Sequence, residues 1–162
     1  MAALLEGFVL RTYAPGDRTA LHEIDFEFQR EVGFDTPERP RHHHDDMDDI
    51  EGVYLNAGGE FWVLERDAKV VAYGGVLRID DTTARLRRFR VRSDWRRHGL
   101  ATVLLEEAER FCRERGYNRV TLDTTDLQEP AQALYRKHGY VEVAERWLDH
   151  WLRQIEFEKV LS

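Results

Sequence analysis

Three strand-like segments follow one another in the middle of the chain, separated by turns of only two or three residues. Residues 60–66 and 69–79 are joined by Asp67-Ala68, and Asp80-Asp81-Thr82 leads into a third segment at 84–92. Connections this short join antiparallel neighbours, because a parallel crossover needs a dozen or more residues. Any fold for this chain must therefore contain an antiparallel meander.

The third segment breaks its own alternating pattern. Leu86 and Phe89 are an odd number of residues apart, whereas Phe89 and Val91 fall on the same face of a strand. A strand repeats every two residues, so all three share one face only if a bulge inserts an extra residue. We therefore predict a β-bulge near Arg87-Arg88.

The other elements are predicted from apolar spacing, caps and turn residues. We expect Asp17 to cap the first helix. The predicted order is strand, two helices, three strands, helix, strand, helix and two strands, which indicates an α/β chain with a largely antiparallel sheet. No repeat or flexible linker interrupts the 162 residues, so we expect a single domain over residues 1–162. The segments outside the meander are strands at 8–13, 119–124, 140–146 and 154–160, and helices at 17–32, 42–55, 100–115 and 130–138.

Charge and composition exclude several classes of protein. The chain has 24 Lys and Arg against 31 Asp and Glu, a net charge of −7, which argues against general nucleic-acid binding. No apolar run approaches the ~18 residues that cross a bilayer, and the N-terminal residues resemble no secretory signal. Cys112 is the only cysteine, and we expect it to be a small core residue. We therefore expect a cytoplasmic protein without nucleic-acid or membrane partners.

The stretch Arg96-Arg97-His98-Gly99-Leu100-Ala101 lies between the third meander strand and the next helix. A helix start leaves backbone N–H groups unpaired and carries a partial positive charge, and Gly99 leaves a ligand room to approach. Such a turn can hold a phosphate or pyrophosphate, although a solvated strand edge feeding an ordinary helix fits the same spacing. The arginines around it form a basic island in an acidic chain: Arg85, Arg87, Arg88, Arg90, Arg92, Arg96 and Arg97.

Two motifs resemble those of the GNAT superfamily of N-acetyltransferases. Residues 96–101 are similar to its Arg/Gln-x-x-Gly-x-Gly/Ala acyl-CoA loop, and residues 131–140 to its A-x-x-L-Y-x-K-x-G-F/Y segment. Residues 86–91 resemble the family's central strand. The resemblance is strong over roughly residues 60–147 and rests on element order elsewhere. It implies a mixed, largely antiparallel central sheet flanked by helices, with a bulged central strand that splays from the next.

The resemblance also implies an activity and its residues. It implies an N-acetyltransferase in which a primary amine attacks the thioester of acetyl-CoA directly in a ternary complex. Tyr135 matches the tyrosine that protonates the departing thiolate, although its ring could instead only pack beside Leu134. Gln128 stands where many relatives have Asn and is expected to contact the pantetheine arm. The remaining cofactor-binding residues implied are Phe89, Arg90, Val91 and Arg92 on the strand and Arg96, Arg97, His98, Gly99, Leu100, Ala101 and Thr102 at the loop.

The general base stays unassigned. Many relatives carry a Glu near the start of the central strand, where this chain has Arg85. An amine is mostly protonated at pH 7 and must lose a proton before it attacks, so a water chain that ends at a titratable side chain is the alternative. The possible terminal groups are Asp80, Asp123, Asp126, Glu60 and His22.

The run His42-His43-His44, followed by Asp45 and Asp46, raises the question of a metal site. Adjacent residues point in different directions, which is poor ligand geometry for one ion. We therefore expect solvated His at a helix start and no metal. The acidic run that follows, residues 45–51, is interpreted either as attracting a cationic amine or as a charge cluster at a helix start.

Two other functional classes and the oligomeric state stay open. The missing Glu would suit a module of the same fold that binds acyl-CoA without turnover. A metal- or partner-binding protein acting through the His/Asp segment is the third class. Trp147 and Trp151 flank the last turn and are interpreted either as core residues or as an exposed patch of a homodimer.

Overall fold

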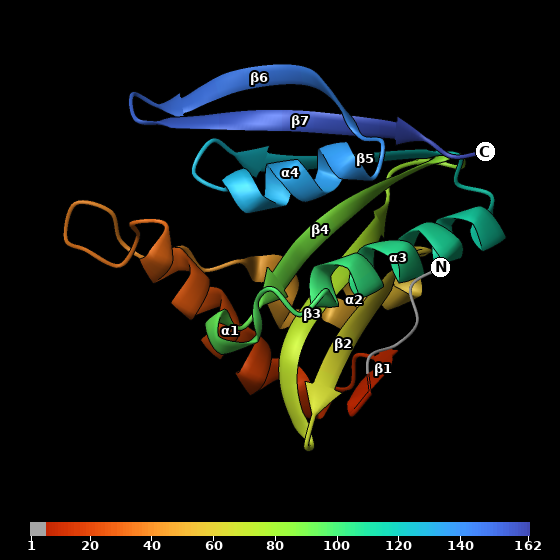
Figure 1. Cartoon of the computed structure of the whole chain (residues 1–162), viewed down its shortest axis with the longest axis horizontal. Coiled ribbons are helices and arrows are strands. Elements are labelled where there is room, and N and C mark those ends of the chain that lie inside the picture. The colour runs from red at the N-terminus through yellow and green to blue at the C-terminus, as the bar shows by residue number, and fades with distance from the viewer. Residues whose placement is uncertain (1–5) are drawn as a thin grey trace.

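The computed structural model describes residues 6–162, and their strands form one seven-stranded sheet in the order β1-β2-β3-β4-β5-β7-β6 (Figure 1). The β4–β5 pair is parallel and every other neighbouring pair is antiparallel. The largely antiparallel sheet and its central meander are therefore confirmed. The strands are β1 (Phe8–Thr12), β2 (Glu60–Arg66), β3 (Lys69–Arg78), β4 (Thr83–Val91), β5 (Arg119–Thr125), β6 (Val141–Asp149) and β7 (Leu152–Val160).

Helices cover both faces of the sheet (Figure 1). On one face α3 packs against β2, β3 and β4, and on the other α1 packs against β3 and β4. The helices are α1 (Arg18–Glu31), α2 (Ile50–Val53), α3 (Leu100–Arg115) and α4 (Glu129–Lys137), with 3-10 turns η1 (Pro15–Asp17), η2 (Asp45–Asp48), η3 (Leu55–Ala57) and η4 (Ser93–Trp95).

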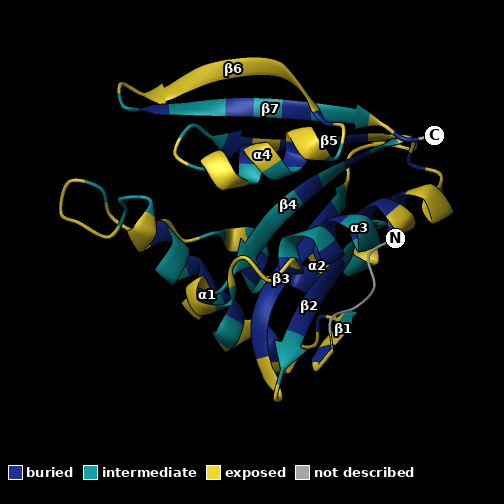
Figure 2. Cartoon of the chain, viewed as in Figure 1, coloured by how far each residue is buried: buried dark blue, intermediate teal, exposed yellow. Residues whose placement is uncertain are grey.

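Each face of the sheet has its own hydrophobic core. Alternate residues of β2 serve the two faces, because successive side chains of a strand point in opposite directions. Trp62 and Leu64 join the core beneath α3, whereas Phe61 and Val63 join the core beneath α1. Strands β2 and β3 are thus buried on both sides, whereas β6 is exposed along its whole length (Figure 2).

The predicted helix at 42–55 is wrong. Residues 42–44 have no regular structure, and η2, α2 and η3 follow in succession. Asp49 breaks the run: its backbone leaves the helical region (φ −141°, ψ 59°), and its carboxylate accepts a hydrogen bond from the Gly52 N–H at 3.1 Å. A side chain that caps one turn in this way ends the turn before it.

The predicted cap at Asp17 is also wrong in its detail. Asp17 occupies the N-cap position of α1, but its carboxylate makes no capping hydrogen bond. It turns back instead and accepts hydrogen bonds from the Ala14 N–H and from the Arg11 guanidinium, each at 2.8 Å. The helix begins here because the η1 turn leads directly into it.

The remaining expectations about the fold concern Cys112, the two tryptophans of the last hairpin and membrane-spanning helices. Cys112 is buried in the core beneath α3, as predicted. Trp147 is 62% exposed on β6, whereas Trp151 lies under the Arg39 guanidinium at 3.5 Å from its ring centre; the homodimer stays a prediction. No helix in the described part of the chain has the length and apolar character to cross a membrane. Residues 1–5, which carry much of the expectation about secretion, lie outside the described residues.

Candidate active site

Strands β4 and β5 pair only where they begin. Thr83, Ala84 and Arg85 lie opposite residues 119–121, and the two strands then diverge (Figure 1). A cavity of about 370 Å³ opens between them, with walls from β4, β5, α4 and the residues just before it, the end of α1, the loop after α1 and the β6–β7 hairpin. The sheet is therefore split at its one parallel pair, and the split holds the candidate site.

A bulge in β4 accompanies this divergence. Arg88 and Phe89 together face Gly74 of β3, so two residues of one strand oppose one of the other. Phe89 covers Gly74 closely, and a Cβ added there would lie 2.7 Å from the ring. Arg88 has a φ of +62°, and its guanidinium is held by Asp46 through hydrogen bonds of 2.6 and 2.9 Å. The predicted bulge is confirmed; bulges bend a strand and increase its twist.

The bulged strand turns part of its backbone toward the cavity side. The N–H of Arg92 donates to the carbonyl of Val71 on β3 at 2.8 Å. Hydrogen-bonded positions alternate in an antiparallel pair, so the backbone of Arg90 faces β3 as well. The main-chain groups of Phe89 and Val91 face the opposite side, where β5 has already diverged. Of the four strand residues predicted to contact a pantetheine arm, Phe89 and Val91 have main-chain groups that turn away from β3, and the contacts themselves stay a prediction.

The start of α3 is open to solvent. None of the N–H groups of residues 97–102 donates a hydrogen bond to an acceptor in the described part of the chain. Gly99 has a φ of +77°, and a Cβ added there would meet nothing within 4 Å. Leu100 is buried in the core, while Ala101 and Thr102 are half-buried. These unpaired donors form the kind of helix start that binds phosphate groups.

In the loop before α3, one side chain holds the loop against α1 and the next two are exposed to solvent. The Arg96 guanidinium pairs with Glu31 at the end of α1, with Nη2 donating to Oε1 at 2.9 Å, and also donates to the Val91 carbonyl at 3.3 Å. Arg96 therefore ties the loop to α1. Arg97 and His98 are exposed, and the left-handed backbone of Arg97 (φ +64°) helps to turn the chain into α3.

Tyr135 and Gln128 both line the cavity. The Tyr135 ring packs against the rings of Tyr140 and Phe157, and only 8% of the residue is exposed. Burial raises the pKa of Tyr135 to about 12, so its hydroxyl is protonated at neutral pH. That hydroxyl makes no hydrogen bond to any described residue. Gln128 precedes α4 and donates from Nε2 to the Thr125 hydroxyl at 3.2 Å.

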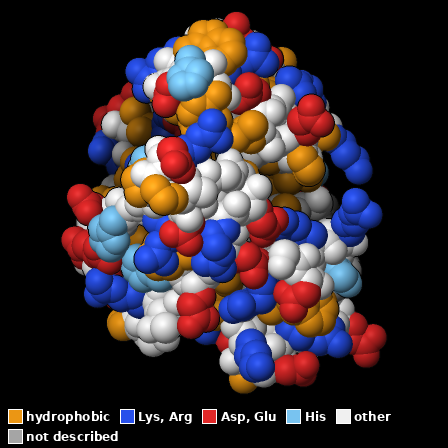
Figure 3. All heavy atoms as spheres, turned by 90° about the vertical axis from the view of Figure 1, so that its left-hand side faces the viewer, with side chains coloured by type: hydrophobic (Ala, Val, Ile, Leu, Met, Phe, Trp, Pro, Cys, Tyr) orange, Lys and Arg blue, Asp and Glu red, His pale blue; other side chains and the backbone are white. Residues whose placement is uncertain are grey.

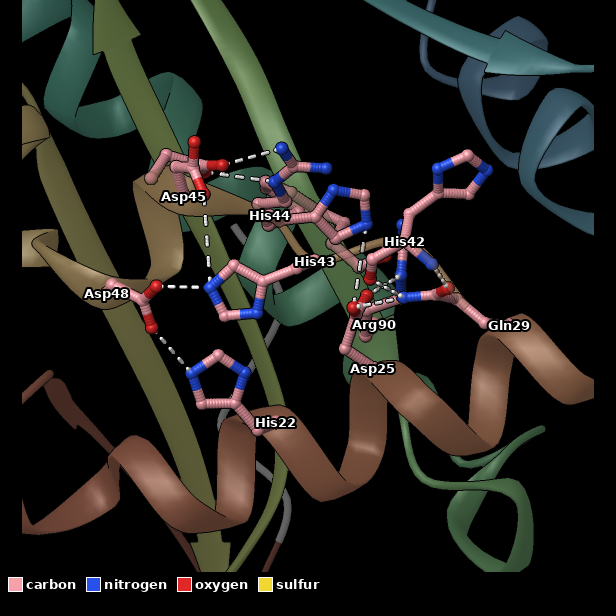
Figure 4. Close-up of polar contacts among 12 residues, drawn as sticks. His22, Asp25, Gln29, His42, His43, His44, Asp45, Asp48 and Arg90 are labelled. Carbon is pink, nitrogen blue, oxygen red and sulfur yellow. Dashed lines mark hydrogen bonds and ion pairs between the residues drawn. The ribbon is translucent and has the colours of Figure 1, made fainter. Parts of the chain in front are cut away.

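Residues from the loop after α1 form the opposite wall. The buried Gln29 amide pairs with both main-chain groups of His42, at 2.7 and 2.9 Å, and also donates to Asp25 at 2.8 Å (Figure 4). His42 and His44 line the cavity. Burial and the positive charge of Arg88 lower the pKa of His44 to about 4, so its imidazole is neutral at pH 7. The sequence predicts solvated His at a helix start, whereas His42 and His44 line a cavity and the His44 side chain is only 22% exposed. No sequence pattern shows which wall a loop residue faces.

Comparison with known proteins decides the family. Residues 19–140 match the Acetyltransferase (GNAT) family. The chain belongs to this family. GNAT enzymes are acyltransferases that use acetyl-CoA as cosubstrate. Human N-acetyltransferase 8 is 37% identical over 121 residues, which cover 71% of this chain and 53% of that protein. The N-acetylaspartate synthetase of Danio rerio is 36% identical over 104 residues, or 63% of this chain and 37% of that protein. The GNAT chain thus spans about half the length of the human relative.

Solved structures agree on the fold. An acetyltransferase from Streptococcus agalactiae matches this GNAT chain with a TM-score of 0.83 and 26% identity, covering 97% of this chain and 100% of that one. An acetyltransferase from Salmonella typhimurium, solved with its cofactor acetyl-CoA, matches with a TM-score of 0.77 and 17% identity, covering 97% and 95%. The second likeness shows the GNAT fold alone.

The structure separates the five candidate bases. Of these, only Asp123 lines the cavity. Its carboxylate is already engaged by Arg85 at 2.9 Å and by Gln154 at 3.0 Å. Arg85 also pairs with Glu156 at 2.8 Å and so joins β4, β5 and β7. The other four, which lie outside the cavity lining, are Asp80, Asp126, Glu60 and His22.

The acidic run 45–51 contributes no residue to the cavity lining, and Asp46 is held by a lining residue. Asp46 binds Arg88 and accepts a hydrogen bond from the Tyr54 hydroxyl at 2.6 Å, and no residue of the run lines the cavity. The cavity lining instead holds Arg87, which makes no direct ion pair with a described residue, although its charge helps to lower the pKa of Asp46 to about 2. Acidic and basic side chains are interspersed over the face with the loop after α1 and the tip of the β6–β7 hairpin (Figure 3).

Proposed function

We propose that this GNAT chain transfers the acetyl group of acetyl-CoA to a primary amine, by direct attack of the amine in a ternary complex. One combination of features carries the proposal: Tyr135 lines the cavity between the diverged β4 and β5, and unpaired N–H groups start the helix that follows β4. A long thioester with an anionic pyrophosphate needs this combination of an open strand edge and an anion site.

Each part of the cosubstrate has a proposed contact. The N–H groups of residues 97–102 hold the pyrophosphate, while Phe89 and Val91 supply main-chain groups to the pantetheine arm. Gln128 lines the same cavity and supplies an amide to that arm. Arg96 contributes indirectly, because its ion pair with Glu31 orients the loop.

The chain supplies two aids to transfer. As the amine nitrogen forms its bond to the thioester carbon, the carbonyl oxygen gains negative charge, which main-chain N–H groups of β4 stabilise. When the carbon–sulfur bond breaks, the Tyr135 hydroxyl donates its proton to the sulfur. The proton of the attacking nitrogen leaves through water, and we assign it no side chain.

The acceptor is proposed to be an amine that also carries an anionic group. Arg88 and Arg90 face carboxylates, with Arg90 Nε 3.5 Å from Asp25, but Arg87 lines the cavity without such a partner. A cation without a direct salt-bridge partner in a partly enclosed cavity favours a negatively charged ligand. The name of one relative, N-acetylaspartate synthetase, indicates that an acidic amino acid is an acceptor within this family.

Two measurements test the function in sequence. Acetyl-CoA at 100 times its dissociation constant stabilises the protein by about 2.7 kcal/mol, so the thermal midpoint should rise clearly with acetyl-CoA and much less with the same concentration of free ADP, which lacks the pantetheine arm. Thiol release is then measured with aspartate, spermidine and a short peptide, and aspartate should react fastest. A thermal shift specific to acetyl-CoA, with no release of the coenzyme A thiol in the presence of any of these amines, would favour a module that binds acyl-CoA without turnover.

A further inference from the structure

Four potential metal ligands converge outside the cavity. His22 projects from α1, His43 comes from the loop before η2, and Asp45 and Asp48 belong to η2. Figure 4 places their side chains together, with the two imidazoles directed at the Asp48 carboxylate. None of the four lines the cavity, so the cluster is separate from the proposed transfer site.

Three of the four residues already have ligand atoms close together, and His22 reaches the cluster through Asp48. His22 Nε2 lies 3.3 Å from Asp48 Oδ1, and His43 Nε2 lies 3.9 Å from Asp45 Oδ1 and in contact with Asp48 Oδ2. The two imidazole rings stack at 5.9 Å with only 11° between their planes. The ligand atoms of His43, Asp45 and Asp48 all lie within 4.8 Å of one another.

We propose that His22, His43, Asp45 and Asp48 bind a Zn²⁺ ion. Zinc takes imidazole nitrogens and carboxylate oxygens at about 2.0–2.2 Å in a tetrahedron, which puts ligand atoms roughly 3.3–3.6 Å apart. The His22–Asp48 and His43–Asp45 separations of 3.3 and 3.9 Å lie near that range. His43 and Asp48 are in direct contact and must part for an ion to enter. Rotation of the exposed Asp45 carboxylate and of the His22 ring would then complete the four ligands. Two carboxylates also balance the charge of a divalent ion bound by neutral imidazoles.

One cation competes for the cluster. Arg18 donates to Asp48 Oδ1 at 2.8 Å. Its side chain is 53% exposed, and an exposed ion pair of this kind contributes little free energy. Arg18 can therefore move into solvent or remain on Oδ1 while Oδ2 faces the ion.

The proposed zinc site uses only one residue of the His run, so adjacent histidines need not share the ion. Of its three residues only His43 joins the cluster, while His42 and His44 face the cavity. The other ligands come from positions that sequence spacing does not connect with the run. An ion here would tie α1 to the loop that carries His42 and His44, and so would hold one wall of the cavity in place.

The test is zinc binding by the protein without any His tag. Protein stripped with EDTA is titrated with ZnCl₂ in a calorimeter, and retained zinc is measured after gel filtration. We expect one ion per chain. The double variant His43→Ala/Asp48→Asn should lose more than about tenfold in affinity, a loss that even outer-shell partners can cause. The control is His150→Ala, because His150 is 87% exposed beside Asp149 without further ligands; its zinc binding should equal that of the wild type.

Two further measurements distinguish the loss of zinc ligands from misfolding of the double variant. The Asp45 side chain is fully exposed, so Asp45→Asn leaves packing intact and should still weaken zinc binding. Co²⁺ bound by the wild type should give the visible absorption of a four-coordinate site, which the double variant lacks. The proposal is overturned if stripped wild-type protein retains no zinc, or if the double variant retains it equally. Because acetyl-CoA is absent throughout, either result leaves the proposed acetyl transfer untouched.

Discussion

At the residue level, the Tyr135 hydroxyl has the environment of a proton donor. Burial keeps its pKa near 12, so it stays protonated until the thiolate develops. Tyr135→Phe should lower turnover by about 10²-fold or more and leave the dissociation constant for acetyl-CoA nearly unchanged, as measured by thiol release and calorimetry. Tyr140→Phe is the matched control, because the Tyr140 hydroxyl is held by Glu109 at 2.8 Å and lies outside the cavity lining. Unchanged turnover in Tyr135→Phe would remove this residue from the mechanism.

A second residue-level prediction concerns stability and pH. Hydrogen bonds from Arg11 hold the pKa of the buried Asp17 below its usual 3.8. A lowered folded-state pKa stabilises the fold fully above the unfolded-state value and loses that stabilisation as pH falls through the folded-state pKa. Asp17→Asn should therefore cost about 1.5–3 kcal/mol at pH 7, and the difference from wild type should shrink below pH 3.8.

Urea unfolding between pH 7 and about pH 2.5 measures this difference. Arg11→Gln should lose the same pH-dependent contribution to the free energy of unfolding, because it removes the cation that lowers the pKa of Asp17. A difference between wild type and Asp17→Asn that stays constant over the whole range would show that the ion pair does not carry the effect.

At the level of elements, helix α3 offers two comparable positions at its ends. Gly99 and Gly116 both have a positive φ, and a Cβ added to either meets nothing within 4 Å. Gly99→Glu brings a negative charge to the N–H groups of residues 97–102, where repulsion of about 1–4 kcal/mol should weaken acetyl-CoA binding by about tenfold or more. Gly116→Glu puts the same charge and backbone strain at the other end, and its affinity should match wild type. Calorimetry with acetyl-CoA decides; equal affinities for both variants would disprove the pyrophosphate assignment.

At the level of the whole molecule, the two cores should melt together. Leu104 lies in the core beneath α3 and Ile24 in the core beneath α1, and β2 and β3 contribute side chains to both. Leu104→Ala and Ile24→Ala should each cost about 2–5 kcal/mol and shift a single transition seen alike by far-UV circular dichroism and tryptophan fluorescence. A second transition that moves in only one variant would argue against the predicted single domain.

Much of the fold could be predicted because its signals are local. The bulge followed from the spacing of Leu86, Phe89 and Val91, and short turns required the meander. The prediction of one helix over 42–55 was wrong because Asp49 can cap a new turn as readily as it can continue a helix. The candidate site was predicted where it rests on backbone, at residues 97–102, and was missed where it rests on loop side chains.

The order of elements, the bulged strand, the open helix start and the resemblance to GNAT enzymes all follow from the sequence, because each depends on residues close together in the chain. Only the tertiary structure decided how far β4 and β5 diverge, and which wall of the cavity each loop residue forms. It also brought His22 beside His43, and turned His42 and His44 the other way. Those outcomes depend on the packing of segments distant in sequence, and local residue spacing carries no information about them.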